Sequence, residues 1–365
     1  MVHKSPSTPA LNRPKGRAKI EDVAREAKVS SATVSRVLNH PAIVRPELRD
    51  KVARAIAKLS YTRDSAGRAL KSGRTHTIGA VVPTLGLSIF AEGIEALQNR
   101  LSESGYTLLI ANAQYDQQRE LQEMRSLLER GIDGIVLVGD SHSLELRTLI
   151  RQAGVSVITT YVSKASKGMP AIGIDNEAAT RELTHYLLDI GHVSFGIIAN
   201  VPPSNDRSRA RLEGVQKSLS LAGINLKPTQ IIKTDHSLGQ GRSAFRQLMT
   251  DHPEVTAVIC TTDSLAIGAM AEARKLGFRV PQSLSITGFD DIELAGQVDP
   301  PLTTISVPAG EIGRGAADYL INAISGLSIP KSIQLPYRLI MRGSTAAPPP
   351  SRTRKSPHAK ALRRR

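Results

Sequence analysis

Near its N-terminus the chain shows a hydrophobic pattern that is typical of short amphipathic helices. Residues 20–27 carry apolar side chains at positions i, i+3, i+4 and i+7, and residues 31–39 carry a similar stripe after a three-residue break. Ser30 fits the N-cap of the second helix. A third helix is predicted from Pro46, a favoured first residue, to about Leu59. The first two helices together have the pattern of a helix-turn-helix.

From residue 77 onwards the pattern changes to short apolar runs, which are typical of strands buried on both faces. Such runs stand at 77–83, 107–112, 134–139, 155–160, 195–200, 256–261 and 284–289. Amphipathic helical stretches lie between them, for example 89–105 and 117–131, and the final glycine of each can end its helix. This alternation predicts doubly wound parallel sheets, and the number of units predicts two similar α/β lobes.

The distribution of charge separates the ends of the chain from its middle. The 365 residues include 48 Lys plus Arg and 33 Asp plus Glu, which gives a net charge of +15. Residues 1–71 hold 16 basic and 6 acidic side chains, and residues 342–365 hold 8 basic and no acidic ones. The segment between them, residues 72–341, therefore has a net charge of −3. Basic ends on a nearly neutral body predict that the ends bind a polyanion and that the body has a different function.

These patterns divide the chain into five segments. We expect a disordered basic arm at 1–18, a helix-turn-helix domain at 19–62, a hinge helix or linker at 63–76, a two-lobed body at 77–345 and a disordered basic tail at 346–365.

Several classes of protein are excluded by what the sequence lacks. The single cysteine, Cys260, excludes an internal disulfide framework and a cysteine-based zinc module. The chain has no run of 18 apolar residues and no apolar segment of a secretory signal at its start, so we expect no membrane span and a cytoplasmic location. Walker, GxSxG and HExxH motifs are absent and the histidines are scattered, so we expect no enzyme, metal or cofactor.

The helix at 31–39 has the side chains that reading DNA requires. Short residues at its N-terminal end let a helix lie deep in the major groove, and a long donor, Arg36, can reach a guanine edge with its forked guanidinium. Hydroxyl groups suited to phosphate oxygens come from Ser30, Thr33 and Ser35. The alternative is a small helical bundle with a polar surface, and the positive charge of this region favours DNA binding.

Two segments of the head carry a resemblance to a known family. IEDVAREAKVSSATVSRVLN (20–39) and VRPELRDKVARAIAKLSY (44–61) resemble the DNA-binding head of the lactose-repressor (LacI/GalR) family. The likeness continues through RGIDGIVL, IGHVSFGII, RLEGV, LGFRVPQSLSITGFDDIE, PPLTTI and LIMRGST, and it covers about 325 of the 365 residues. The resemblance implies a helix-turn-helix head, a hinge and an α/β core similar to a periplasmic binding protein.

The resemblance also implies roles for individual residues of the head and hinge. Ser31 and Ala32 match the family's main base-reading pair, Arg36 matches its conserved arginine, and Leu70 matches the hinge leucine that wedges into the minor groove. Asn39 in the second helix and Arg68 and Lys71 beside Leu70 complete the expected DNA contacts. An ordinary linker leucine is the alternative for Leu70. The chain departs from the family at Lys28, where glycine is common, and at Lys19, which replaces a threonine N-cap.

Polar and aromatic residues that follow the predicted strands are the candidates for binding a small effector between the lobes. They are Phe90, Asn112, Asp116, Arg211, His236, Thr262 and Asp290. An arginine and an aspartate across a cleft can hold vicinal hydroxyls, and an aromatic ring can stack on a sugar or a base. The alternative for each residue is a surface or capping role. The resemblance matches Arg211 and Asp290 to the family's effector residues, and Thr262 replaces a common asparagine.

These observations predict a sequence-specific DNA-binding regulator, by default a repressor, controlled by a sugar or sugar derivative. We expect a homodimer, or a dimer of dimers, on a near-palindromic operator. A regulator that uses a purine or another metabolite as corepressor is one alternative. A stand-alone sugar-binding protein would need a secretory signal and no helix-turn-helix, and a sugar-converting enzyme would need a catalytic cluster.

Overall fold

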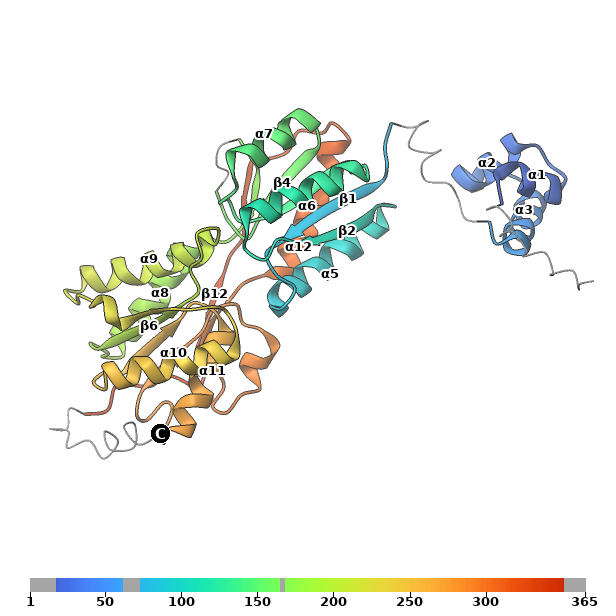
Figure 1. The fold of residues 1–365 in the computed structure, drawn as a ribbon. Helices are drawn as coiled ribbons and strands as arrows, with labels where there is room; N and C mark the ends of the chain where they lie inside the picture. Colours follow the sequence, from blue (N-terminus) through green and yellow to red (C-terminus); the bar gives the residue numbers. More distant parts are fainter. Residues whose placement is uncertain (1–17, 62–72, 165–167, 351–365) are drawn as a thin grey trace, which may run out of the picture. The chain divides into compact units, whose positions relative to one another are not determined.

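The computed structural model describes residues 18–61, 73–164 and 168–350. The chain divides into two compact units, Met1–Thr75 and His76–Arg365, which are taken separately below. Figure 1 draws the remaining residues in grey. Most of the expected arm, most of the expected hinge with Arg68, Leu70 and Lys71, and the tail from residue 351 lie outside the described residues.

The first unit is a three-helix head. It contains α1 (Ile20–Ala27), α2 (Ser31–Asn39), a short 3-10 turn at Pro41–Ile43 and α3 (Pro46–Leu59). The three helices predicted from the hydrophobic pattern are therefore confirmed. Small apolar side chains from all three helices form the core, namely Val23, Ala24, Ala27, Val34, Val52 and Ala55.

The turn between α1 and α2 has a backbone conformation that non-glycine residues rarely adopt. Lys28 ends α1 with φ 54° and ψ 47°, the left-handed conformation expected from a position where glycine is common. Ser30 then caps α2, because its Oγ accepts a hydrogen bond of 3.1 Å from the backbone N–H of Thr33. At the start of α1, the Asp22 carboxylate accepts a 2.9 Å bond from the Lys19 N–H.

The second unit consists of two α/β lobes. Lobe 1 is built on a parallel six-stranded sheet of order β11-β5-β4-β3-β1-β2. Its strands are β1 (Thr77–Val82), β2 (Thr107–Asn112), β3 (Gly134–Val138), β4 (Ser156–Thr160), β5 (Ala171–Gly173) and β11 (Ser332–Gln334). One face is covered by α5 (Ser88–Glu103) and α12 (Ala309–Ile324), the other by α6 (Gln117–Glu129) and α7 (Leu144–Ala153).

Lobe 2 repeats this architecture around a parallel four-stranded sheet of order β7-β6-β8-β9. Its strands are β6 (Phe195–Ala199), β7 (Ile231–Lys233), β8 (Ala257–Cys260) and β9 (Ser285–Thr287). One face packs against α8 (Asn176–Asp189) and α9 (Asp206–Leu221), the other against α10 (Leu238–Asp251) and α11 (Asp263–Lys275). Two 3-10 turns, at Pro228–Gln230 and Glu293–Gly296, join elements of this lobe.

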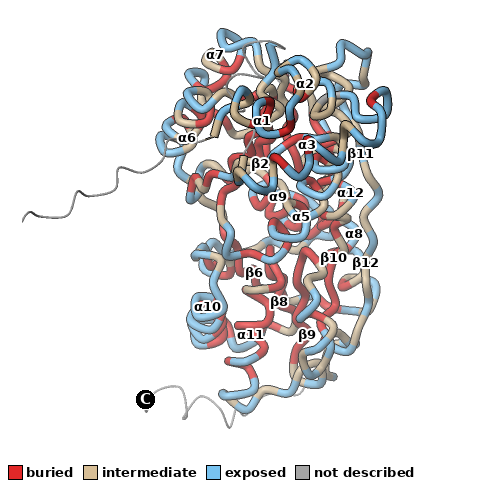
Figure 2. Tube along the Cα trace, turned by 90° about the vertical axis from the view of Figure 1, so that its right-hand side faces the viewer, coloured by how far each residue is buried: buried red, intermediate tan, exposed pale blue. Residues whose placement is uncertain are grey.

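The chain passes from one lobe to the other more than once. It leaves lobe 1 after β5, returns to it at α12, and crosses again after β11. The segments near the last crossings pair as a small antiparallel ribbon, β10 (Thr304–Ser306) with β12 (Arg338–Ile340). Figure 2 shows β6 and β8 within the buried interior of lobe 2, whereas α10 presents an exposed surface. The two-lobed α/β architecture predicted from the alternating pattern is confirmed.

One strand is less buried than the hydrophobic pattern predicts. The run at 107–112 forms β2, but β2 lies at the edge of its sheet and pairs with β1 alone. Ile110 is therefore 42% exposed instead of buried on both faces. Gly105 and Gly131 follow α5 and α6 with φ +74° and φ +73°, so the prediction that each glycine ends its helix is confirmed.

The C-terminal part of the body is anchored to lobe 2 through His192. The His192 Nε2 atom lies 3.0 Å from the Ala346 carbonyl oxygen, and Ser285 Oγ donates to the same oxygen over 3.0 Å. Burial lowers the pKa of His192, which favours the neutral ring at this position. Ala346, the first residue of the expected tail, therefore belongs to the anchored part of the chain.

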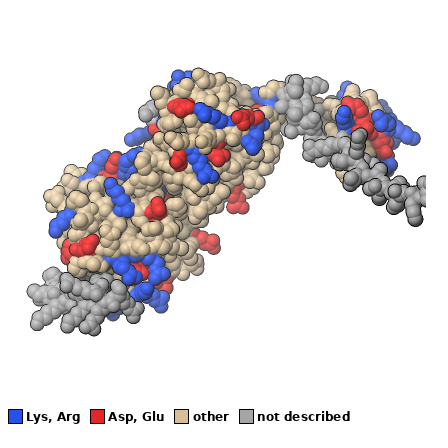
Figure 3. Space-filling model, in the orientation of Figure 1, with Lys and Arg blue, Asp and Glu red and all other residues tan. Residues whose placement is uncertain are grey.

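Charged groups of both signs are scattered over the face of the body that Figure 3 shows. On the face shown in Figure 3, Lys and Arg side chains lie beside Asp and Glu side chains without a large field of one sign. None of the helices in the described ranges is both long and apolar enough to cross a membrane.

The strain at Lys28 leads to a stability prediction. Lys28→Gly should stabilise the head by about 1 kcal/mol, because glycine adopts a positive φ without the Cβ clash. Lys28→Ala removes the same charge but keeps Cβ, so it should give no such gain. Hydrogen–deuterium exchange of the α1 and α2 amides should slow in the glycine variant only. Equal exchange in both variants would show that the turn is unstrained.

Candidate functional site

Strained backbone gathers where the strands of the two lobes end. Residues with a side chain and a positive φ include Gln114 (52°) and Tyr115 (58°) after β2, Tyr161 (64°) after β4, and Asp290 (118°) and Asp291 (57°) after β9. Such conformations cost energy and persist only where the surrounding structure holds them. Their concentration at strand ends points to the space between the lobes as the functional site.

Arg211 on α9 is the centre of the wall that lobe 2 presents there. Its Nε donates to Asn176 Oδ1 over 2.9 Å, and its Nη1 donates to the Thr261 carbonyl oxygen over 2.8 Å. The same Nη1 lies 3.2 Å from Asp290 Oδ1. The guanidinium carbon also lies 3.6 Å from the centre of the Phe289 ring, a cation–π contact. Arg211 therefore joins α8, α9 and the ends of β8 and β9.

Arg211 and Asp290 form an ion pair that is almost fully buried. The two residues are 7% and 5% exposed. Burial raises the pKa of Asp290 to about 6, although the adjacent Arg211 opposes the shift, and burial also lowers the pKa of Arg211. We expected an arginine and an aspartate facing each other across a cleft. That expectation is wrong in one respect, because both residues belong to lobe 2 and contact each other directly.

A second buried carboxylate, Asp263, lies behind this pair at the start of α11. It accepts a 2.6 Å hydrogen bond from the Thr304 hydroxyl and a 2.9 Å bond from the backbone N–H of Ile292. Burial and the nearby charge of Asp290 raise the pKa of Asp263 to about 7. Asp263 thus holds the loop that carries Asp290.

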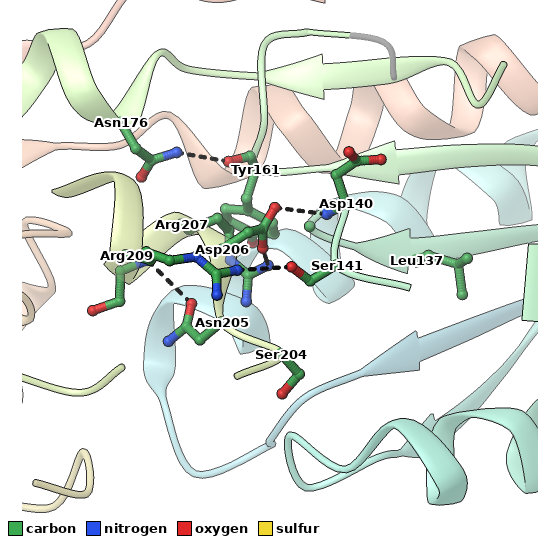
Figure 4. A network of polar contacts seen from close by, with 12 residues as sticks. Leu137, Asp140, Ser141, Tyr161, Asn176, Ser204, Asn205, Asp206, Arg207 and Arg209 are labelled. Carbon is green, nitrogen blue, oxygen red and sulfur yellow. Dashed lines mark hydrogen bonds and ion pairs between the residues drawn. The ribbon is translucent and has the colours of Figure 1, made fainter. Parts of the chain in front are cut away.

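The first turn of α9 contacts lobe 1 directly (Figure 4). Asp206 Oδ2 accepts a 2.7 Å hydrogen bond from the backbone N–H of Asp140, which follows β3. Asp206 Oδ1 accepts a 2.8 Å bond from Arg207 Nη1. Gly139 lies below them with φ +82°, a conformation that favours glycine, and a Cβ atom there would lie 1.8 Å from Arg207 Nη1 and displace the guanidinium. Arg209 completes the contact by donating to Ser141 Oγ over 3.0 Å.

Lobe 1 holds the loop after β3 in place for these contacts. His142 lies with Nδ1 2.9 Å from Glu120 Oε1 and Nε2 2.9 Å from the Gly139 carbonyl oxygen. Arg147 donates to the Asp140 carbonyl oxygen and forms an ion pair of 3.2 Å with its side chain. The loop after β3 is therefore held in a defined conformation by side-chain contacts.

Aromatic side chains face each other between the lobes. Tyr115 from lobe 1 and His236 from lobe 2 have ring centres 5.9 Å apart. The pKa of the Tyr115 hydroxyl is raised, because the effect of burial outweighs the opposing effect of the Arg207 charge. Tyr115, Ser141, Ser204 and Arg207 are among the residues that line one small cavity between the lobes.

The other predicted effector residues have local partners. Asp116 caps α6 by accepting from the N–H groups of Gln118 and Arg119, and Thr262 caps α11 by accepting from Leu265. Asn112 accepts a 3.2 Å bond from the Gln114 N–H. Phe90 is 6% exposed and packs edge-on against Tyr161 with ring centres 5.2 Å apart.

In the head, α2 presents the predicted DNA-reading residues at its surface. Ala32 and Arg36 are exposed, and Ser31, Thr33 and Ser35 are partly exposed. The Ser30 and Thr33 hydroxyl oxygens lie 2.9 Å apart. The side chain of Asn39 lies outside the described part of the chain.

Several site residues were missed by sequence reasoning, chiefly Tyr115, Tyr161, Asn176, Asp206 and Arg207. A signal for two of them was present, since Asn205-Asp206-Arg207 carries opposite charges and follows the apolar run 195–200 after a short Pro-containing loop. The others act through backbone geometry or through partners distant in sequence. Within residues 18–61, 73–164 and 168–350, no cluster of three or more histidine, cysteine or acidic side chains could hold a metal ion.

Two family profiles match most of the chain. Residues 19–64 match the family described as bacterial regulatory proteins, lacI family. Residues 75–343 match the family described as periplasmic binding proteins and sugar binding domain of LacI family.

Individual relatives agree with these matches. The chain is 33% identical over 333 residues to the HTH-type transcriptional repressor CytR of Escherichia coli K12, covering 91% of this chain and 97% of that protein. A solved lac repressor dimer bound to operator and the anti-inducer ONPF superposes with TM-score 0.79 and 27% identity, over 91% of this chain and all of that one. A complex of the regulator CelR with cellobiose superposes with TM-score 0.66 and 28% identity, over 90% of this chain and 100% of that one.

The raised pKa of Asp263 predicts a pH dependence of stability. The folded chain binds the proton of the Asp263 carboxyl group more tightly than the unfolded chain does. The stabilisation of the folded state by protonated Asp263 is therefore complete below about pH 4 and is lost as the pH rises through about 7. Between pH 5 and pH 7 the wild type should lose roughly 2 kcal/mol relative to Asp263→Asn, whose side chain stays neutral. Urea unfolding of both proteins across this range measures the difference. A difference independent of pH would contradict the assignment.

Proposed function

The chain belongs to the LacI family of bacterial regulatory proteins, a family of DNA-binding transcriptional repressors rather than enzymes, and we propose that a small molecule bound between its lobes controls its affinity for an operator. The observation that carries the proposal is the combination of a helix-turn-helix head with a cleft in which a buried arginine is already oriented.

For the head, we propose that α2 lies in the major groove. Ser31 and Ala32 contact base edges, Arg36 forms a bidentate contact with a guanine, and Asn39 lies near the same groove. Hydroxyls of Ser30, Thr33 and Ser35 contact phosphates. The exposure of Ala32 and Arg36 on one short, capped helix supports this assignment.

For the hinge, we propose that Leu70 enters the minor groove and that Arg68 and Lys71 contact the adjacent phosphates. This part of the proposal depends on the family resemblance, since these residues lie outside the described part of the chain. An apolar wedge between base pairs would bend the duplex.

For the cleft, we propose a sugar or sugar derivative as effector. Arg211 and Asp290 bind its hydroxyls from lobe 2, and Phe90, His236, Asn112, Asp116 and Thr262 shape the surrounding space. The complex of the similar regulator CelR with cellobiose supports a sugar ligand. The edge-on packing of Phe90 against Tyr161 gives less support to a stacked purine.

We further propose that two copies of the chain act together on a near-palindromic operator. Two heads related by two-fold symmetry match two half-sites, which is the general arrangement for this kind of reader. The exposed Ile110 on edge strand β2 offers an apolar edge for association of two bodies.

Replacement of the proposed base-reading arginine tests the head. Arg36→Ala should reduce discrimination between operator and random DNA by roughly 1–3 kcal/mol and leave weak, salt-sensitive binding. Fluorescence anisotropy with a near-palindromic duplex from upstream of the gene and with a random duplex measures both affinities. Arg54→Ala, an exposed arginine on α3, is the matched control and should keep the discrimination. Unchanged discrimination in Arg36→Ala would place the reading surface elsewhere.

Replacement of the buried aspartate tests the cleft. A screen of sugars by operator release from the wild type first identifies an active compound. In Asp290→Asn, the concentration of that compound needed for half-release should rise roughly tenfold or more, because a charge-assisted contact is lost. Operator affinity without the compound should remain within a few-fold. Asp251→Asn, on the exposed end of α10, serves as control, and an equal response of both variants would exclude Asp290 from the site.

A further inference from the structure

The turn that carries Asp290 has two consecutive residues in unfavourable backbone conformations. Asp290 has φ 118° and Asp291 has φ 57°. Such conformations persist only where neighbouring contacts hold them. The backbone N–H of Asp290 donates to the Ile305 carbonyl oxygen over 2.9 Å, which fixes the start of the turn. The position of the Asp290 carboxylate therefore depends on the contacts that hold the residues after it.

One of these contacts comes from within lobe 2. Asp263, at the start of α11, accepts a 2.9 Å hydrogen bond from the backbone N–H of Ile292. The other oxygen of Asp263 accepts a 2.6 Å bond from the Thr304 hydroxyl. These bonds fix the backbone that follows Asp291, whereas the side chain of Asp291 has a different partner.

That partner is Arg342, which lies in the last segment that crosses from lobe 1 to lobe 2. Arg342 Nη2 lies 2.7 Å from Asp291 Oδ1, and Arg342 Nη1 donates to the Leu302 carbonyl oxygen over 3.0 Å. The side chains of Arg342 and Asp291 are 24% and 19% exposed, so water reaches the pair only in part. One guanidinium therefore bridges the Asp290 turn and the segment that precedes β10.

The backbone on both sides of Arg342 is itself anchored. The Arg342 N–H donates to Thr303 Oγ1 over 2.9 Å, and Ser344 Oγ donates to the Ile286 carbonyl oxygen over 2.6 Å. Just before Arg342, β12 pairs with β10, and Figure 1 shows β12 where the two lobes meet. The guanidinium thus reaches Asp291 from a backbone whose position is set by the crossing segment.

We propose that Arg342 is a positioning residue of the effector site, which holds Asp291 and thereby fixes the orientation of the Asp290 carboxylate. This inference rests on the proposed function, in which Asp290 binds the effector. Arg342 acts through Asp291 and not on the effector itself. A guanidinium suits this role because separate N–H donors of one planar fork reach two acceptors, whereas a lysine ammonium is a point charge on a flexible stem.

Hydrogen–deuterium exchange of the full chain, with no added compound, tests the contact directly. In Arg342→Gln the amides of 288–292 should exchange roughly tenfold faster than in the wild type, because the turn loses a charge-assisted contact. Asp291→Asn should give a similar increase, since asparagine tolerates a positive φ but lacks the charge. The double variant should exchange no faster than the more affected single variant. Arg338→Gln removes the same charge from an exposed position on β12 and should exchange like the wild type.

Two readouts distinguish positioning from a general loss of stability. A general loosening of lobe 2 would raise exchange in β6 and β8 as well, whereas positioning confines the increase to 288–292 and the facing segment 302–306. Operator release by the compound that the sugar screen identifies gives the second readout. Its concentration for half-release should rise roughly five- to tenfold in Arg342→Gln, while operator affinity without it stays within a few-fold. Arg342→Lys, which keeps the charge without the fork, should lie between the two.

Several results would overturn the inference. They are unchanged exchange of 288–292 in Arg342→Gln, single-variant increases that add in the double variant, and half-release of Arg342→Gln at the wild-type concentration. If Arg342→Gln does not fold, the same comparisons are made with Arg342→Lys. A screen in which no sugar releases the operator would count against the proposed function, and the exchange of 288–292 would still decide whether Arg342 holds the Asp290 turn.

Discussion

The buried ion pair between Arg211 and Asp290 is the constraint on which the site depends. Through its further bonds to Asn176 and Thr261, Arg211 joins helices α8 and α9 to the ends of β8 and β9, and its partner Asp290 has a backbone φ of 118°. A buried pair of this kind adds little net stability, because desolvation offsets the attraction, but removal of one partner typically costs about 3–5 kcal/mol. We infer that the pair is kept for its geometry. It fixes a guanidinium and a carboxylate on one wall before any ligand arrives, so little reorganisation is needed on binding.

The contact between the lobes explains how occupancy of the cleft could reach the rest of the body. Asp206 and Arg209 from lobe 2 bond to the loop after β3, and Arg207 packs over Gly139 in the same loop. In the proposed function, a molecule bound beside these residues changes the contacts that hold the lobes together. A ligand shifts such an equilibrium only by its difference in affinity for the two arrangements, and coupling of about 1–3 kcal/mol is typical of regulators. Most of the expected hinge at 63–76 lies outside the described residues.

The parts of the molecule that could be predicted from the sequence are those set by local periodicity. The helix pattern of the head, the Ser30 cap and the alternating units of the body follow from neighbouring residues, whereas the left-handed Lys28 is suggested only by the resemblance to a family in which glycine is common at this position. The site is less predictable, because Arg211 and Asp290 are 79 residues apart and their direct contact arises from the packing of four elements. Positive φ at Tyr115 and Tyr161 is imposed by tertiary structure against local preference, so the sequence carries no signal for it. Edge strand β2 has the composition of a central strand, and only the sheet order shows that it is exposed.

We propose that this chain recognises a particular DNA sequence through α2 and does so as a pair of heads. Selection from a pool of random-sequence duplexes by the full-length chain, at near-physiological salt, tests it most directly. Repeated rounds should enrich one near-palindromic sequence with two related half-sites. A pool that binds through the basic ends of the chain but remains random in sequence would contradict it.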